Sequence, residues 1–266
     1  MLGWPANGAL AKRCRQRRPH GPTRRWLQAC TQSRRKGLPT SNFHTARFPR
    51  PNMEIMMTPE QTAIVLVGFQ NDYFDRSGIL RSVVEDDGGI DRVRAATLAF
   101  LRAVEDSPVM IVATPIQFTD DYSELVDPVG ILKTIRECGA FRRERPGGQT
   151  IPELVAMGPR IQHVPGKRGL NAFSNTELES VLRERGVTNI VLAGVVTSVC
   201  IDSTGRSAHE RGFSVTILSD CTGGRTRYEQ DFYCREVFPL YADVKTAVEI
   251  TAALQGGGQA LAIGGN

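Results

Sequence analysis

The stretch Ile190-Val-Leu-Ala-Gly-Val-Val-Thr-Ser-Val-Cys200 decides the fold of this 266-residue chain. Its first half is a short apolar run that has the length and the β-branched side chains of a buried parallel strand. A helical pattern over about residues 200–211 follows directly. A strand that turns into a helix at a cysteine predicts an α/β unit with that cysteine at the carboxyl end of the strand.

The same alternation of strand and helix extends over most of the chain. Apolar runs predict further strands at about residues 63–67, 109–113, 160–164 and 213–218. Periodic segments predict helices at about 90–105, 176–185, 225–235 and 243–254, whereas 115–158 contains Gly and Pro throughout and is expected to be irregular. This order predicts a three-layer α/β/α sandwich with a mostly parallel, Rossmann-like sheet. In such sheets, ligands bind beyond the carboxyl ends of the strands.

Charge divides the chain into a basic N-terminal segment and an acidic remainder. Residues 1–53 hold 12 Lys and Arg residues and no Asp or Glu, whereas residues 54–266 hold 21 basic and 28 acidic residues. We therefore predict a disordered basic extension over 1–57, a folded domain over 58–254 and a flexible tail over 255–266. The extension has three interpretations: a transit peptide, a basic arm, or residues upstream of a later start codon. Because the domain is acidic, we expect no nucleic-acid partner.

Apolar runs and cysteines bear on the location of the protein. No run approaches the roughly 18–20 apolar residues of a membrane-spanning helix, so we expect no membrane contact. The six cysteines form no C-x-x-C pair, which favours reduced thiols and a cytoplasmic location. An organelle is the alternative if residues 1–53 are a transit peptide.

The common cofactor and metal motifs are missing from the sequence. The turn after the first strand, Gly68-Phe-Gln-Asn-Asp-Tyr-Phe74, lacks the G-x-G-x-x-G pattern, and no P-loop occurs. His163 and His209 have no second histidine at metal-ligand spacing. We therefore predict no metal and no cofactor.

Cys200 is the best candidate for a nucleophile. A thiol at a helix N-terminus is stabilised as a thiolate by the helix dipole, and the free N–H groups there could hold an oxyanion. Thr197 or Ser198 is suited to be the N-cap. Lys167, after the third strand, should project from the same sheet edge and could stabilise a thiolate. The alternatives are a cysteine that packs as a small hydrophobe and a lysine that is a solvated loop charge.

Three blocks in order resemble the isochorismatase-like cysteine hydrolases: Ala63-Ile-Val-Leu-Val-Gly-Phe-Gln-Asn-Asp-Tyr-Phe74, Lys167-Arg-Gly-Leu-Asn-Ala-Phe-Ser-Asn-Thr-Glu-Leu178, and Ile190 to Cys200 followed by Ser203-Thr204 and Ala208. The resemblance covers about residues 62–250. It implies a hydrolase that cleaves an amide or carbamoyl C–N bond of a small molecule through a thioester on Cys200, with Lys167 as charge partner. It also implies a homo-oligomer and a cis peptide at Val195–Val196 that directs the N–H groups of Val196 and Cys200 into an oxyanion hole.

The sequence departs from this family at the end of the first strand. The family places a catalytic aspartate where this chain has Gly68. Another carboxylate could substitute, with Asp72, Asp120 and Asp121 as candidates, or Lys167 alone could sustain a slower or different reaction. The other possibility is a catalytically impaired member that binds a small molecule or a protein. The second strand is followed by no histidine, unlike the metal-binding nicotinamidase branch.

Residues near the expected sheet edge are candidates for a substrate pocket. The predicted substrate-binding residues are Phe69, Gln70, Phe118, Phe141 and Phe173. Ordinary core packing explains the aromatic ones equally well. Arg142, Arg143 and Arg145 could receive a carboxylate or form an exposed basic face.

Overall fold

The computed structural model describes residues 57–85 and 88–256. The predicted extension over 1–57 and the tail over 255–266 lie outside these residues, except for Met57 and the last two residues of the final helix. Six parallel strands form one sheet in the order β3-β2-β1-β4-β5-β6. The strands are β1 Thr62–Val67, β2 Met110–Thr114, β3 Gln162–His163, β4 Asn189–Val195, β5 Ser214–Gly223 and β6 Asp243–Lys245.

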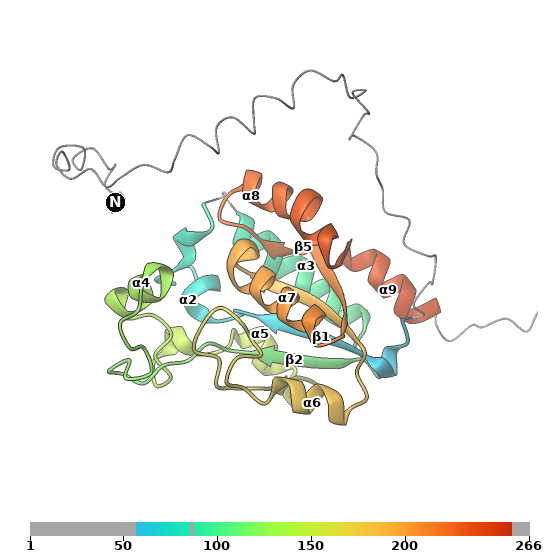
Figure 1. Cartoon of the computed structure of the whole chain (residues 1–266), viewed down its shortest axis with the longest axis horizontal. Coiled ribbons are helices and arrows are strands. Elements are labelled where there is room, and N and C mark those ends of the chain that lie inside the picture. The colour runs from blue at the N-terminus through green and yellow to red at the C-terminus, as the bar shows by residue number, and fades with distance from the viewer. Residues whose placement is uncertain (1–56, 86–87, 257–266) are drawn as a thin grey trace, which may run out of the picture. The chain divides into compact units, whose positions relative to one another are not determined.

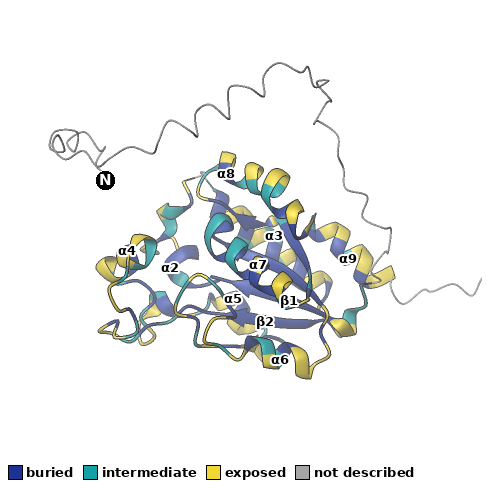
Figure 2. Ribbon diagram, viewed as in Figure 1, coloured by how far each residue is buried: buried dark blue, intermediate teal, exposed yellow. Residues whose placement is uncertain are grey.

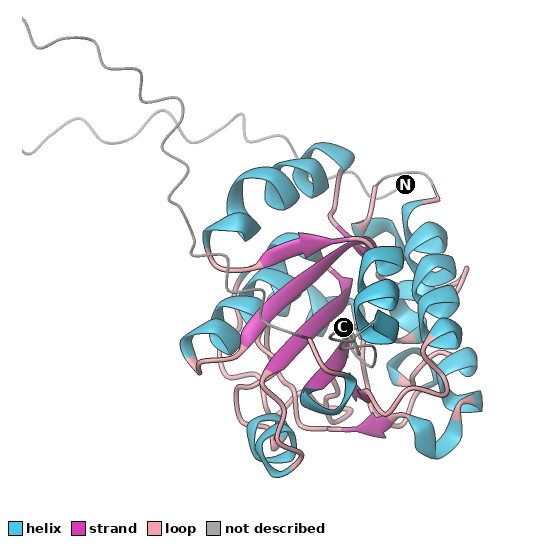
Figure 3. Ribbon diagram, turned by 90° about the vertical axis from the view of Figure 1, so that its right-hand side faces the viewer, coloured by secondary structure: helices cyan, strands magenta, loops and turns pink. Residues whose placement is uncertain are grey.

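Helices cover both faces of the sheet (Figures 1 and 3). They are α2 Asn71–Phe74, α3 Gly89–Ala103, α4 Gly130–Cys138, α5 Pro152–Ala156, α6 Leu178–Glu184, α7 Asp202–Glu210, α8 Arg227–Phe232 and α9 Ala247–Gly256. This arrangement confirms the predicted three-layer sandwich.

Alternating side chains of the buried strands supply two separate apolar cores. Ile64 and Leu66 of β1 pack on one face with side chains of α3 and α9, whereas Ala63 and Val65 pack on the other face with side chains of α6 and α7. Every residue of β1 is buried, which is the pattern of a parallel strand covered on both sides. Figure 2 shows the strands as buried and the outer surfaces of the helices as exposed.

Two sequence predictions were wrong in detail. The helix expected over 243–254 begins at Ala247, because Asp243-Val-Lys245 pairs with Thr216–Leu218 as the edge strand β6. The segment 115–158, expected to be irregular, contains α4 and α5. Only Ile135 of α4 is buried, so this helix presents too narrow an apolar stripe to be distinguished from its loops.

The strand order reverses between β1 and β4, which lie side by side at the centre of the sheet. Such a reversal opens a crevice beyond the carboxyl ends of the two strands. Gly194 of β4 allows the two strands to lie this close together, because a Cβ atom there would lie 1.8 Å from the carbonyl oxygen of Val67 in β1. The residues after β1 and β4 are therefore brought together.

Within the described part of the chain, no helix has the length and apolar character that crossing a membrane requires.

Candidate active site

The chain leaves β4 through a π-helical turn, Thr197–Ile201, that places Cys200 at the end of the strand. The carbonyl oxygen of Val196 accepts hydrogen bonds from the N–H groups of Val199, Cys200 and Ile201, at 3.1, 3.0 and 3.2 Å. The regular helix α7 then starts at Asp202, two residues later than predicted. The Cys200 N–H, expected in an oxyanion hole, is therefore engaged within the turn. The Val196 N–H takes no part in these three bonds.

The peptide bond between Val195 and Val196 is cis, as the family resemblance implied. Both residues are fully buried. This bond joins the last residue of β4 to the residue whose carbonyl oxygen organises the turn around Cys200.

Two helix α8 side chains hold the turn from outside, a contact that the sequence analysis missed. Thr197 Oγ1 donates to Gln230 Oε1 at 2.5 Å, and Ser198 Oγ donates to Glu229 Oε1 at 2.6 Å. These hydroxyls do not cap the turn, contrary to the expectation for Thr197 or Ser198. The sequence offers no signal for this contact, because Glu229 lies 31 positions after Ser198 and no local pattern joins the two.

Glu229 is a charged anchor for this turn. Its carboxylate also accepts from the Arg225 backbone N–H at 3.1 Å and from Arg225 Nε at 2.8 Å. Burial alone would raise the pKa of Glu229, but the hydrogen bonds from Ser198 and Arg225 and the Arg225 charge hold it below its ordinary value. A buried carboxylate with several donors stays ionised and fixes the position of Ser198, two residues before Cys200.

Lys167 reaches the same point from the loop after β3. It is 1% exposed, and its Nζ atom lies 3.5 Å from Cys200 Sγ and 2.6 Å from the carbonyl oxygen of Gly169. An isolated parallel β-bridge joins the backbone of Lys167 to that of Ile116, just after β2, and fixes the loop that carries the lysine. Cys200 itself is 7% exposed. The lysine is thus a buried partner of the cysteine and not a solvated loop charge.

No described Asp or Glu forms an ion pair with Lys167. A buried ammonium group is costly unless an anion balances it. Since the Cys200 sulfur is its acidic neighbour, a thiolate there would supply the balancing charge.

The three candidate carboxylates occupy other positions. Asp72 is buried, and its Oδ2 atom accepts from the Phe141 N–H at 2.6 Å. Burial raises the pKa of Asp72, against the opposing effect of backbone hydrogen bonds from Phe141 and Ile79. Asp72 therefore holds a loop in place.

Asp120 and Asp121 belong to an exposed turn after β2. Asp120 lies 3.8 Å from Arg145 Nε, with more than half of its side chain exposed. Asp121 accepts from Thr119 Oγ1 at 2.7 Å and from the Ser123 N–H at 3.2 Å. These hydrogen bonds lower the pKa of Asp121. Both carboxylates are thus engaged within this exposed turn or with Arg145, and neither has a hydrogen bond to Cys200 or Lys167 among the described residues.

Gly68, at the end of β1, has no room for a side chain. Its φ is +76°, and a Cβ atom would lie 2.8 Å from the carbonyl oxygen of Val195. The backbone at this position therefore leaves no space for the side chain of an aspartate.

The predicted substrate-binding aromatic residues are buried in packing contacts. Phe118 and Phe141 are fully buried, and Phe69 stacks on Phe74 with ring centroids 4.8 Å apart. Phe173 packs against Phe213, which directly precedes β5 and so lies at the amino end of that strand, away from the carboxyl ends of the strands. That Phe69, Phe118, Phe141 and Phe173 bind substrate stays a prediction, because the sequence shows the apolar character of a side chain and not the direction in which it points.

Gln70 links β1 to two loops. Its Nε2 atom donates to the carbonyl oxygens of Ile116 and Gly148 at 2.8 and 2.7 Å, and its Oε1 atom accepts from the Ile116 N–H at 2.9 Å. Both amide donors are used, so Gln70 positions loops and offers no donor to a substrate. Arg142 stacks over Tyr122 at 5.3 Å, and exposed Arg145 faces Asp120.

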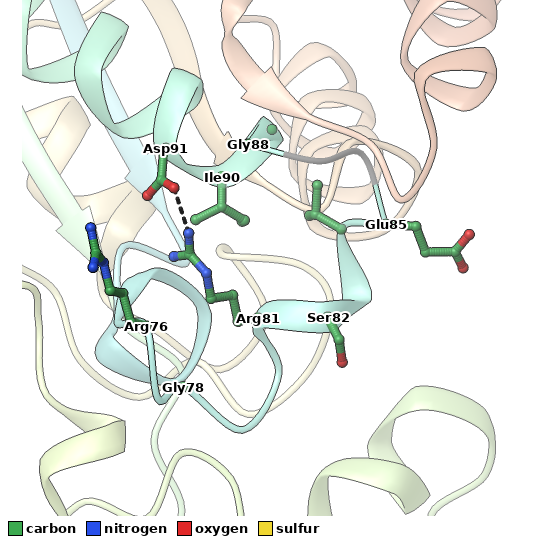
Figure 4. A pocket seen from close by; sticks show the side chains of 10 residues that line it. Arg76, Gly78, Arg81, Ser82, Glu85, Gly88, Ile90 and Asp91 are labelled. Atoms are coloured by element: carbon green, nitrogen blue, oxygen red, sulfur yellow. Dashed lines mark hydrogen bonds and ion pairs between the residues drawn. The ribbon is translucent and has the colours of Figure 1, made fainter. Parts of the chain in front are cut away.

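A surface pocket of about 670 Å³ lies between the loop after α2 and the start of α3 (Figure 4). Arg81 and Asp91 on its wall pair with each other at 2.6 Å. Neither Cys200 nor Lys167 lines this pocket. Among the described residues, no cluster of three or more His, Cys, Asp or Glu side chains is suited to a metal ion.

Comparison with known proteins identifies the isochorismatase domain over residues 62–249. An enzyme of Rhizobium rhizogenes named ureidoacrylate amidohydrolase is 28% identical over 196 residues, covering 69% of this chain and 79% of that protein. A cysteine hydrolase from Pseudomonas syringae pv. phaseolicola 1448A has the same fold, with a TM-score of 0.66, 23% identity, and coverage of 76% of this chain and 96% of that one. The fold also matches N-carbamoylsarcosine amidase from Thermoplasma acidophilum, with a TM-score of 0.55, 19% identity, and coverage of 70% and 96%.

Proposed function

The chain belongs to the isochorismatase family, and on that premise we propose that it is a cysteine hydrolase of a small-molecule C–N bond, amide or carbamoyl. The observation that carries the proposal is the buried pair formed by Cys200 Sγ and Lys167 Nζ, 3.5 Å apart. Two similar proteins, a ureidoacrylate amidohydrolase and an N-carbamoylsarcosine amidase, are named for cleavage of such bonds and support this bond type.

Nucleophilic attack by Cys200 splits the hydrolysis into two steps. Sγ forms a bond to the carbonyl carbon while the C=O π electrons move to the oxygen. The Val196 N–H is the proposed donor to that oxyanion. Collapse of the adduct breaks the C–N bond, the amine or ammonia leaves with a proton, and a thioester remains. Water then cleaves the C–S bond and releases the acid.

The Lys167–Cys200 pair can carry the required proton without a carboxylate. In one state the pair is thiol and amine, and in the other it is thiolate and ammonium, so the two states differ only by the place of one proton. The ammonium form gives its proton to the leaving nitrogen, and the resulting amine accepts one from the attacking water. Departure of the thiolate from the hydrolysed thioester restores the ion pair. We propose this dyad as the substitute for the family aspartate.

A second candidate function is binding without turnover. Gly68 favours it, because the position leaves the pair without the family carboxylate and has no space for one. We further propose a cytoplasmic homo-oligomer; the free thiols of Cys138, Cys200, Cys221 and Cys234 support a reducing compartment.

Incubation with primary amides and N-carbamoyl amino acids tests the proposal. We expect release of ammonia and a covalent adduct of the acyl group on the Cys200 peptide, identified by mass spectrometry. Cys200→Ala should abolish both, whereas Cys138→Ser, a change at an exposed thiol, should retain them. Turnover that survives Cys200→Ala contradicts the thioester. Binding of a probe without turnover by the wild-type protein supports the second candidate.

A further inference from the structure

Helix α8 carries the only Phe and Tyr side chains of residues 57–85 and 88–256 that are exposed. Tyr228 is 78% exposed and Phe232 is 43% exposed, and their rings stack with centroids 6.2 Å apart and an interplanar angle of 17°. The helix lies at the periphery of the molecule (Figure 1). Exposure of two aromatic rings to water is unfavourable, and Tyr and Phe are enriched in protein–protein interfaces. This aromatic pair therefore marks a candidate interaction surface.

The inner side of α8 is fixed to the rest of the domain. Glu229 and Gln230 accept hydrogen bonds from two hydroxyls of the turn that contains Cys200, at 2.6 and 2.5 Å. Directly after the helix, the ring of Tyr233 packs edge-on against the fully buried Phe238, with centroids 5.6 Å apart. The aromatic pair thus lies on a helix that is already ordered, so binding of a partner there costs little conformational entropy.

Two opposite charges flank the aromatic pair and do not pair with each other. Arg227 and Asp231 are exposed and four positions apart, yet no ion pair joins them among the described residues. Their order is unfavourable within one helix, because an acidic residue is better placed on the N-terminal side of a basic one and a cation is disfavoured in the first turn. Across two antiparallel copies of α8, the same order places Arg227 of each copy opposite the partner's Asp231. The charges of this surface are therefore complementary to themselves under a two-fold rotation.

A pocket of about 350 Å³ adjoins these charges. Arg227, Gln230 and Asp231 form one wall, and residues from the first half of α3 and the end of β5 form the others. The volume lies within the range of about 300–1,000 Å³ that holds small molecules, so an aromatic ring fits into it. An aromatic side chain inserted into a pocket of the partner is a common anchor of a protein–protein contact. This face of α8 thus combines exposed rings with a hollow that suits them.

We propose that the α8 surface, which consists of Arg227, Tyr228, Asp231, Phe232 and the adjoining pocket, is the contact between two copies of this chain. The two α8 helices lie antiparallel about a two-fold axis. The aromatic pair of each copy packs on the other copy, and Arg227 forms an ion pair with the partner's Asp231 on either side of the axis. An aromatic centre with a charged rim is the usual layout of a protein–protein interface. This inference rests on the proposed homo-oligomer and names the surface that forms it, but it does not depend on the thioester reaction.

Sedimentation velocity of the full-length chain over a series of concentrations tests the contact. The wild type should form a dimer or a larger even-numbered assembly. The double variant Tyr228→Ser/Phe232→Ser removes the aromatic anchors, and Arg227→Asp places like charges opposite each other on both sides of the axis. Each should raise the dissociation constant about tenfold or more.

An exchange of the two charges separates a direct pairing from general damage to the surface. Arg227→Asp/Asp231→Arg restores both ion pairs in the reverse sense, so its dissociation constant should return to within about threefold of the wild-type value. Val126→Ser is the control, because it changes an 85% exposed apolar residue in the loop before α4. It should leave the dissociation constant unchanged.

A wild-type oligomer that persists in both Tyr228→Ser/Phe232→Ser and Arg227→Asp overturns the inference and leaves the homo-oligomer to another surface. A wild-type monomer overturns both. An exchanged variant that does not associate refutes the two-fold pairing of the charges. Circular dichroism shows whether each variant is folded, and should Arg227→Asp not fold, Asp231→Arg makes the same test. Hydrolysis of amides is measured separately, so its absence from a protein that associates as expected refutes only the proposed reaction.

Discussion

Substitution of Gly68 by alanine is expected to destabilise the protein far more than its single methyl group suggests. The residue has a φ of +76°, and a positive φ costs a residue with a Cβ atom about 1–2 kcal/mol. In addition, the new Cβ atom would lie 2.8 Å from the carbonyl oxygen of Val195, which is backbone of the central strand β4. Displacement of such packed groups costs about 1–3 kcal/mol, so the total is about 2–5 kcal/mol.

Gly212 provides a matched control for this substitution. It has a φ of +81°, and a Cβ atom there would meet no heavy atom within 4 Å. Gly212→Ala should therefore cost only the conformational part, about 1–2 kcal/mol. The difference between the two variants isolates the contact with Val195.

Urea unfolding followed by circular dichroism measures both free energies of unfolding. Alkylation of Cys200 provides a second readout, because movement of Val195 must also move Val196, whose carbonyl oxygen accepts the hydrogen bonds of the turn that contains Cys200. A Gly68→Ala variant no less stable than Gly212→Ala would refute the reasoning about this contact. By the same reasoning Gly68→Asp should fail to restore a family-like carboxylate, because the aspartate would require the same movement of β4.

Two further substitutions test the residues around Cys200. Lys167→Met keeps the buried stem and removes the charge, so turnover should fall about 10²–10⁴-fold with the fold retained; turnover within tenfold of the wild type would exclude proton transfer by this lysine. Glu229→Gln should cost about 1–3 kcal/mol of unfolding free energy at pH 7, because it weakens the bonds from Ser198 and Arg225. Since the folded-state pKa of Glu229 lies below its ordinary 4.5, this cost should be complete above that pH and shrink as the pH falls through the lowered value, and a cost independent of pH would contradict the assignment.

The same alkylation experiments contain an internal reference. Burial, with a contribution from the charge of Asp220, raises the pKa of the Cys221 thiol to about 12. Its peptide should therefore stay unmodified under conditions in which Cys200 reacts. Labelling of Cys221 would indicate that the fold has opened, and such a sample would be set aside.

The sequence by itself determined the architecture and the position of Cys200 just after a central strand, because both depend on local patterns. Uninterrupted apolar runs are the mark of strands covered on both faces, and the central strands β1, β2 and β4 lie where such runs predicted. The placement of Cys200 and Lys167 after two strands of one parallel sheet also followed, since all carboxyl ends of such a sheet lie at the same edge.

Short or narrow elements could not be predicted from the sequence, and the reason is physical. The strand β6 has three residues at the edge of the sheet, and α4 buries only Ile135, so neither leaves enough apolar residues for a period to emerge. The role of the aromatic residues predicted to line a pocket could not be decided from the sequence either, because an apolar side chain suits a protein core and the wall of a binding site equally well.

Only the tertiary structure decided which side chains meet at the sheet edge. The contact of Ser198 with Glu229 joins residues that are 31 positions apart, a separation that no local period records. The tertiary structure likewise decided the interactions of the acidic candidates. Asp72 accepts a hydrogen bond from the loop residue Phe141, and Asp120 and Asp121 interact within or beside an exposed turn. A residue type shows what chemistry a side chain can perform, but the packing of distant loops determines whether that side chain lies at hydrogen-bond distance from the reacting atom.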